Sequence, residues 1–145
     1  GQELLNNGGF EMLDQHGIPE GWIPYGRPSL ASAEDAPRTG RVAVQANAQA
    51  WLYQQVAAEP GRLYTLGHWT RADQPGQFAR LQVNWLSKDS KLVRASIEVV
   101  PADTDWQLRR MAVTAPLDAA YAHVYVSVHG DSTVWFDDVS FVAEN

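Results

Sequence analysis

The segment Tyr121–His129 alternates strictly between two kinds of side chain. Alanine and valine occupy its even positions, whereas tyrosine, histidine and serine occupy its odd positions. Side chains of a β-strand point alternately to the two faces of a sheet. We therefore expect one face of this strand to lie in a hydrophobic core and the other to present rings and hydrogen-bonding groups to solvent.

Short runs of the same kind recur along the chain between Gly and Pro turn signals, and no long segment has a helical period. Many short strands separated by turns predict an all-β fold, an antiparallel β-sandwich or jelly roll of two sheets. One short helical turn is expected at Leu30–Ala36, where Pro37 would end it. The expected strands are Arg41–Ala46, Trp51–Val56, Leu63–Arg71, Phe78–Ser87, Ser96–Val100, Gln107–Thr114, Tyr121–His129 and Thr133–Phe141.

The size and composition of the chain indicate one globular domain, residues 1–145, of which 45% are hydrophobic. No apolar run approaches the ~20 residues of a membrane span, and the start at Gly1 suggests a mature fragment or a module of a longer protein. Cysteine is absent, which excludes disulfides, a thiol nucleophile and cysteine metal ligands. A net charge of −6 without a basic cluster argues against nucleic acid or an anionic membrane as partner.

The parity of the other strands predicts a surface shared by several of them. On each strand we assign the more apolar set of alternate positions, such as Leu81, Val83 and Trp85, to the core. The Leu63–Arg71 strand is the least regular, because the same rule places His68 in the core. The remaining side chains are predicted to form one solvent-facing surface, made of Trp51, Tyr53, Trp69, Arg71, Arg80, Gln82, Asn84, Tyr121, His123 and Tyr125.

Rings and polar side chains on an open sheet suit a sugar ring. Aromatic rings cover the apolar C–H face of a pyranose, much as they stack on nucleic-acid bases, while Arg, Gln and Asn pair with its hydroxyls. Trp51 and Trp69 carry most weight, since exposed tryptophan usually marks a contact with a partner. The alternative is that these are ordinary strand residues, or that the surface is a protein–protein interface of a structural or adhesive domain.

Catalytic arrangements are poorly represented. The predicted surface has none of the paired carboxylates that glycoside hydrolysis requires. Asp137 and Asp138 are neighbours on a strand, so we expect them to point to opposite faces. A third alternative is an enzyme, a lyase or hydrolase in which His123 and Tyr125 act as acid and base. We nevertheless interpret the chain as a binding module and not as an enzyme.

Two acidic residues stand near the chain ends, next to the expected core anchors Phe10 and Phe141. If the ends converge, Glu11 and Asp138 come together, and two adjacent carboxylates repel unless a cation or proton lies between them. Oxygen ligands without His or Cys favour Ca²⁺. The other possibility is that both carboxylates bond backbone groups.

Several motifs in fixed order cover nearly the whole chain, namely Asn7–Glu11, Gly21-Trp22, Gly40–Val44, Leu52–Gln54, Pro60-Gly61, Tyr64–Leu66, Trp106 and Trp135–Phe141. Together they resemble the carbohydrate-binding modules of the family 4/9/22 superfamily. The resemblance implies a galactose-binding-domain-like β-sandwich with a structural calcium at Glu11 and Asp138. It also implies an aromatic-lined cleft on the concave sheet that binds β-glucan, xylan or related chains. The expected partner is therefore a polysaccharide or oligosaccharide, and the expected setting is a monomeric module of a secreted bacterial glycoside hydrolase.

Overall fold

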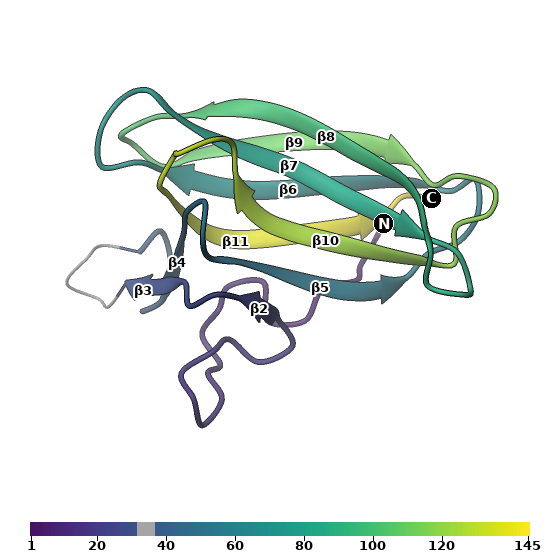
Figure 1. The fold of residues 1–145 in the computed structure, drawn as a ribbon, viewed down its shortest axis with the longest axis horizontal. Coiled ribbons are helices and arrows are strands. Elements are labelled where there is room, and N and C mark those ends of the chain that lie inside the picture. Colours follow the sequence, from purple (N-terminus) through teal and green to yellow (C-terminus); the bar gives the residue numbers. More distant parts are fainter. Residues whose placement is uncertain (32–36) are drawn as a thin grey trace.

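A computed structural model describes residues 1–31 and 37–145, and its described part consists of two stacked antiparallel β-sheets without a helix (Figure 1). The predicted all-β sandwich is therefore confirmed. Among these residues, none belongs to a helix long and apolar enough to cross a membrane. The strands are β1 Gln2–Glu3, β2 Ile23–Tyr25, β3 Ser29–Ala31, β4 Ala43–Ala46, β5 Trp51–Ala57, β6 Leu63–Arg71, β7 Gln77–Leu86, β8 Leu92–Ala102, β9 Gln107–Thr114, β10 Tyr121–Val128 and β11 Val134–Ala143.

The chain passes back and forth between the two sheets. One sheet has the order β3-β4-β11-β6-β9 with β1 paired to β11, and the other has the order β2-β5-β10-β7-β8. From β4 onward successive strands alternate between sheets, and only the β7–β8 hairpin stays within one. Figure 1 shows β5, β10, β7 and β8 side by side over β11, β6 and β9, with the two termini close together. Strands that are neighbours in sequence therefore mostly face opposite sides of the molecule.

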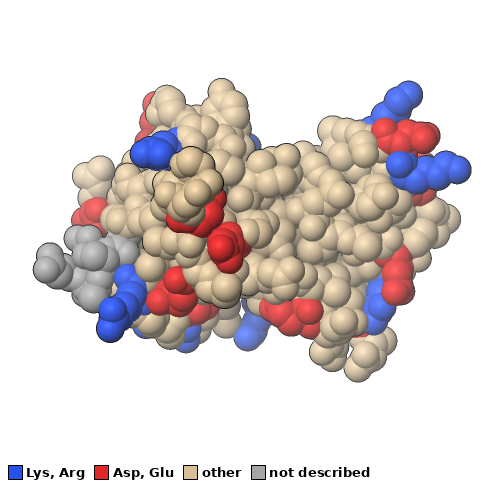
Figure 2. All heavy atoms as spheres, turned by 90° about the horizontal axis from the view of Figure 1, so that it is seen from below, with Lys and Arg blue, Asp and Glu red and all other residues tan. Residues whose placement is uncertain are grey.

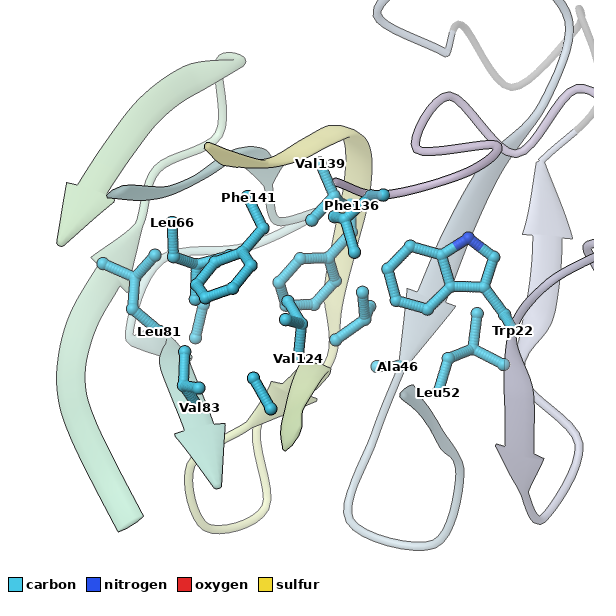
Figure 3. Close-up of a cluster of buried hydrophobic side chains, with 14 of the residues drawn as sticks. Trp22, Ala46, Leu52, Leu66, Leu81, Val83, Val124, Phe136, Val139 and Phe141 are labelled. Carbon is cyan, nitrogen blue, oxygen red and sulfur yellow. The ribbon is translucent and has the colours of Figure 1, made fainter. Parts of the chain in front are cut away.

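The core lies between the sheets and follows the predicted parity. Leu81, Val83 and Trp85 are fully buried, and so are the anchors Phe10 and Phe141. Figure 3 shows side chains of both sheets pointing toward one another in this layer, including Phe141, Leu81 and Val83. Alternation of apolar residues on β7 and β10 thus correctly separates buried from outward positions, whereas on β8 the apolar Ile97 and Val99 are exposed.

His68 is the polar residue that this parity placed in the core, and the structure buries it completely. Its Nε2 lies 3.3 Å from the carbonyl oxygen of Arg80, which can only accept, so Nε2 carries the proton. The ring also meets Phe136 edge-on at 5.1 Å. Burial lowers the pKa of His68 to about 4, against an ordinary value of 6.5, so the core holds a neutral imidazole.

The short strands and several strand ends differ from the sequence prediction. Leu30 pairs within β3 instead of forming a helical turn, and the rest of that predicted turn lies outside the described residues. The three residues of β2, Ile23–Tyr25, were not predicted, because Pro24 interrupts the pattern; an edge strand tolerates it. β8 is longer than predicted, since its pairing with β7 continues through positions where the alternation is weak. Boundaries of this kind are decided by the partner strand.

Candidate functional site

The outer side of the five-stranded sheet carries most of the predicted surface, and we call it the aromatic face. Tyr53 pairs with Tyr125, and His123 pairs with Gln55 on one side and Asn84 on the other. Paired residues of antiparallel strands point to the same side, so the rings and amides are neighbours. Eight of the ten predicted residues share this face, namely Trp51, Tyr53, Arg80, Gln82, Asn84, Tyr121, His123 and Tyr125.

Trp69 and Arg71 do not belong to it, and the prediction that they share this surface is wrong. Both lie on β6, in the other sheet. The guanidinium of Arg38 covers the Trp69 ring at 3.6 Å, and Arg71 forms an ion pair with Asp73 at 3.1 Å. Their outward orientation follows from parity, but β5 and β6 run in opposite sheets, so outward for β6 is the far side of the sandwich.

The rings of the aromatic face form a nearly continuous row across three strands. Tyr25 of β2 stacks on Trp51 with centroids 4.0 Å apart and an interplanar angle of 12°. Tyr53 lies 4.7 Å from the His123 ring and 5.5 Å from Tyr125. Sequence reasoning missed Tyr25, which is 57% exposed, because its strand has only three residues. The alternation of Ile23 and Tyr25 just before a glycine was the available signal.

Polar groups beside the rings are held in fixed orientations. The Gln82 amide donates to Asn84 Oδ1 at 2.9 Å, and Asn84 Nδ2 donates to the Tyr125 hydroxyl oxygen at 3.3 Å. The Tyr125 proton and the Gln82 carbonyl therefore remain available to a ligand. His123 Nε2 bonds Gln55 Oε1 at 2.8 Å.

Both titratable rings among these groups are uncharged near neutral pH. Burial lowers the pKa of His123 and so disfavours its imidazolium form. Burial also raises the pKa of Tyr125; the neighbouring Tyr53 adds to this shift, whereas the bond from Asn84 opposes it. His123 and Tyr125 thus offer neutral donors and acceptors, which suit hydroxyl groups.

A cavity of about 430 Å³ is hollowed at one end of the aromatic face. Its lining includes Trp51, Arg80, Gln82, Tyr125 and Ser127, together with Asn47 from the turn between β4 and β5. Its volume falls in the range of roughly 300–1,000 Å³ typical of small-molecule sites. Ser127 Oγ and Arg80 Nε are buried and have no hydrogen-bond partner among the described residues. The cavity therefore combines an indole with the polar side chains of Arg80, Gln82 and Tyr125.

The remaining edge of the face is apolar. Val99 and Ile97 of β8 pair with Arg80 and Gln82 and are 42% and 48% exposed. Neither Asp nor Glu occupies any position that the strand registers place on this face in β2, β5, β10, β7 and β8. A pair of carboxylates, as used in glycoside hydrolysis, is therefore not available on these strands.

The two ends of the chain converge at a second cluster, away from the aromatic face. The Val139 N–H donates to the Gly8 carbonyl at 2.9 Å. The Glu11 carboxylate accepts from the backbone N–H of Arg41 at 2.7 Å and of Val42 at 2.9 Å. The alternative that both carboxylates bond backbone groups therefore holds for Glu11, whereas Asp138 bonds the side chains of Arg38 and Thr39.

Asp138 and Asp137 both reach the same segment. Asp138 pairs with Arg38 at 2.7 Å and accepts from the Thr39 hydroxyl, and Asp137 accepts from the Thr39 N–H at 3.1 Å. The prediction that these two carboxylates point apart is wrong. The pairing of β11 with β6 shifts register between Asp137 and Ser140, and Asp138 has φ of +48°, so the strand does not alternate here.

Asp137 is fully buried, and burial raises its pKa to about 6, with the charges of Asp138 and Glu11 adding to the shift. The donors at this junction are all oxygens, the type that calcium takes. Within residues 1–31 and 37–145, however, no three His, Cys, Asp or Glu side chains are grouped to hold a metal ion. The junction fits calcium in donor chemistry, with the carboxylates already bonded to protein groups.

Comparison with known proteins places this geometry in a fold family. No family model and no curated protein matches the chain. Among solved structures, a family 4 carbohydrate-binding module is 19% identical, with a TM-score of 0.66 over 96% of this chain and 99% of that one. The chain has the fold of these carbohydrate-binding modules.

Two further modules of this fold have been solved with oligosaccharides. A family 61 module in complex with β-1,4-galactotriose is 21% identical, with a TM-score of 0.70 over 99% of this chain and all of that one. The family 22 and GH10 modules of Clostridium thermocellum endo-1,4-β-D-xylanase 10B, in complex with xylohexaose, are 17% identical with a TM-score of 0.73. That match covers 99% of this chain and 29% of the xylanase chain. The resemblance seen in the sequence motifs is thus confirmed at the level of fold.

Proposed function

We propose that this chain is a non-catalytic carbohydrate-binding module that binds a polysaccharide of the β-glucan or xylan type on its aromatic face. The observation that supports this most is the row of rings Tyr25, Trp51, Tyr53, His123 and Tyr125, which lies beside oriented amides and leads into a cavity. Solved modules of the same fold carry galactotriose and xylohexaose.

Binding follows from the chemistry of the two surfaces. A pyranose buries its C–H face on a ring for roughly 1–3 kcal/mol, by analogy with base stacking. The Tyr125 hydroxyl and the Gln82 and Asn84 amides then select hydroxyl positions. Because the rings support one another within the sheet, little side-chain freedom is lost on binding.

The test compares two tryptophans of opposite sheets. Trp51→Ala removes one platform, so affinity for the polysaccharide that the parent binds should fall roughly 5- to 150-fold, the equivalent of 1–3 kcal/mol. Trp69→Ala is the matched control and should stay within about twofold of the parent, because Trp69 lies on the far sheet. Calorimetry and affinity gels with β-glucan, xylan and mannan measure both.

Two results contradict the proposal. One is a parent protein that binds none of a broad panel of glycans. The other is a loss of binding in Trp69→Ala that equals the loss in Trp51→Ala while both variants remain folded.

We further propose that the module is monomeric and serves a secreted bacterial glycoside hydrolase, as part of a longer multidomain protein. The support is that the family 22 neighbour is joined to a GH10 module. Tethering raises the effective concentration of an enzyme at its polymer even when a single module binds weakly.

We also infer a structural calcium ion with Glu11 and Asp138 as ligands. The support is an excess of negative charge where the chain ends meet, since the charges of Glu11 and Asp138 both act on Asp137 and Arg38 forms the ion pair found there among the described residues. A divalent cation would relieve the repulsion from Asp138 and Glu11, which adds to the effect of burial in raising the pKa of Asp137.

A further inference from the structure

Arg80 is a cation of the aromatic face without an acidic partner. Each ion pair among the described residues involves another arginine, Arg38, Arg62, Arg71 or Arg109. Arg80 instead places Nη2 3.4 Å from His129 Nδ1, and its Nε is buried without a hydrogen-bond partner. The protein has more acidic than basic residues, with a net charge of −6, yet none of the carboxylates in residues 1–31 and 37–145 forms an ion pair with this group.

The surroundings of Arg80 do not supply the missing charge. Its neighbours across the sheet are Ser127 on β10 and Val99 on β8. Strand positions on this face hold neither Asp nor Glu, and the other titratable side chains nearby are His129, His123 and tyrosines. Asp131, in the turn after β10, is exposed and makes no ion pair with Arg80.

The chemistry of guanidinium indicates what completes this site. Its planar fork pairs with a carboxylate through two parallel hydrogen bonds, which are among the strongest in proteins. Trp51 lines the same cavity and supplies a platform for a pyranose ring. A neutral sugar can hydrogen-bond Arg80, but it cannot form the charge-assisted pair that a carboxylate forms with guanidinium.

We propose that the cavity accepts a uronic acid residue of an acidic polysaccharide, with its carboxylate paired to Arg80 and its ring on Trp51. The proposal rests on the proposed function and names the class of sugar that the same site prefers. His129 contacts Arg80, so its imidazole ring then lies beside the bound carboxylate.

The experiment uses uronate-bearing polysaccharides, each paired with its own carboxyl-reduced form. Glucuronoxylan, polygalacturonate and alginate form the panel, and calorimetry at low and high salt measures affinity. At least one acidic polymer should bind about tenfold or more tightly than its reduced form, and about 0.5 M salt should diminish this preference.

The variants locate the preference. Arg80→Gln should abolish the preference, measured as the ratio of the affinities for the acidic polymer and for its reduced form, and Arg80→Lys should restore only part of it, because lysine keeps the charge without the fork. Arg110→Gln is the control, since it makes the same charge change at an exposed position on β9, in the other sheet.

The outcomes separate this proposal from the proposed function. Equal binding of acidic and reduced polymers, or a preference that survives Arg80→Gln, overturns the uronate site while the module still binds glycan. If a sulfated polymer competes equally well for binding, the cavity recognises negative charge alone, and this result overturns the carboxylate assignment. Failure of every polymer, acidic or reduced, overturns both.

Discussion

His68 makes the stability of this fold depend on pH in a direction that can be worked out from the structure. Its imidazole lies between the sheets, and burial lowers its pKa to about 4. In the unfolded chain the same ring titrates near 6.5. Between these values the unfolded state binds the proton and the folded state does not, so stability falls as pH falls.

The magnitude follows from the difference between the two pKa values. Each pH unit in this window contributes up to about 1.4 kcal/mol, so His68 alone lowers the free energy of unfolding by about 3 kcal/mol between pH 6.5 and 4. The contribution is fully present above pH 6.5. For a domain whose total stability is about 5–15 kcal/mol, this is a substantial fraction.

Asp137 acts in the opposite sense over part of the same range. Its pKa is raised to about 6, so its folded state takes up a proton before the unfolded state does, and stability rises as pH falls from 6 toward 3.8. The pH profile of the parent protein therefore mixes both effects. Only the difference between the parent and a His68 variant isolates the histidine.

His68→Gln is the appropriate variant, because the glutamine amide has no titration and can still donate to the Arg80 carbonyl. Urea unfolding at pH 7, 5.5 and 4.5 measures the free energy of unfolding of both proteins. We expect the advantage of the parent over the variant to shrink by about 2–3 kcal/mol from pH 7 to pH 4.5. A difference that stays constant within about 0.5 kcal/mol would show that His68 is not held neutral in the core and would refute this reasoning.

Two further predictions concern the place where the chain ends meet. At Gly8 an added Cβ would overlap the Val139 carbonyl oxygen, so Gly8→Ala should cost several times the roughly 1 kcal/mol expected for Gly76→Ala, a left-handed glycine with open space around it. Thermal unfolding compares the two variants, and equal losses would contradict the close approach. If calcium binds there, chelation should lower the melting temperature and added Ca²⁺, but not Mg²⁺, should restore it, with glycan binding unchanged below the transition. Asp138→Asn should abolish this response to calcium. A melting curve of the parent that does not change on chelation would contradict the inferred calcium ion.

Much of the candidate site could be predicted from the alternation of side chains along single strands. Alternation along β10 correctly separated Val124 from Tyr125, and the same rule on β7 separated Val83 from Asn84. The rule works because each strand has one buried face, and a strand's side chains repeat every two residues regardless of what it pairs with. The resemblance of the terminal motifs to those of carbohydrate-binding modules additionally predicted the type of β-sandwich.

The alternation of side chains along a strand does not indicate which of the two sheets the strand joins. Trp51 and Trp69 both point outward, but they stand on opposite sides of the molecule, because hydrogen bonding between distant segments places β5 and β6 in different sheets. The same limit concealed Tyr25, whose strand exists through its pairing with β5.

What the sequence determined by itself is therefore the set of residues that face outward on each strand, since that depends on a local period. What only the tertiary structure decided is which of them are neighbours. Asp137 and Asp138 reach one segment through a register shift, and Arg80 lies beside Ser127 without a carboxylate because of the order of five strands. Neighbourhoods of this kind depend on long-range pairing, which no local pattern encodes.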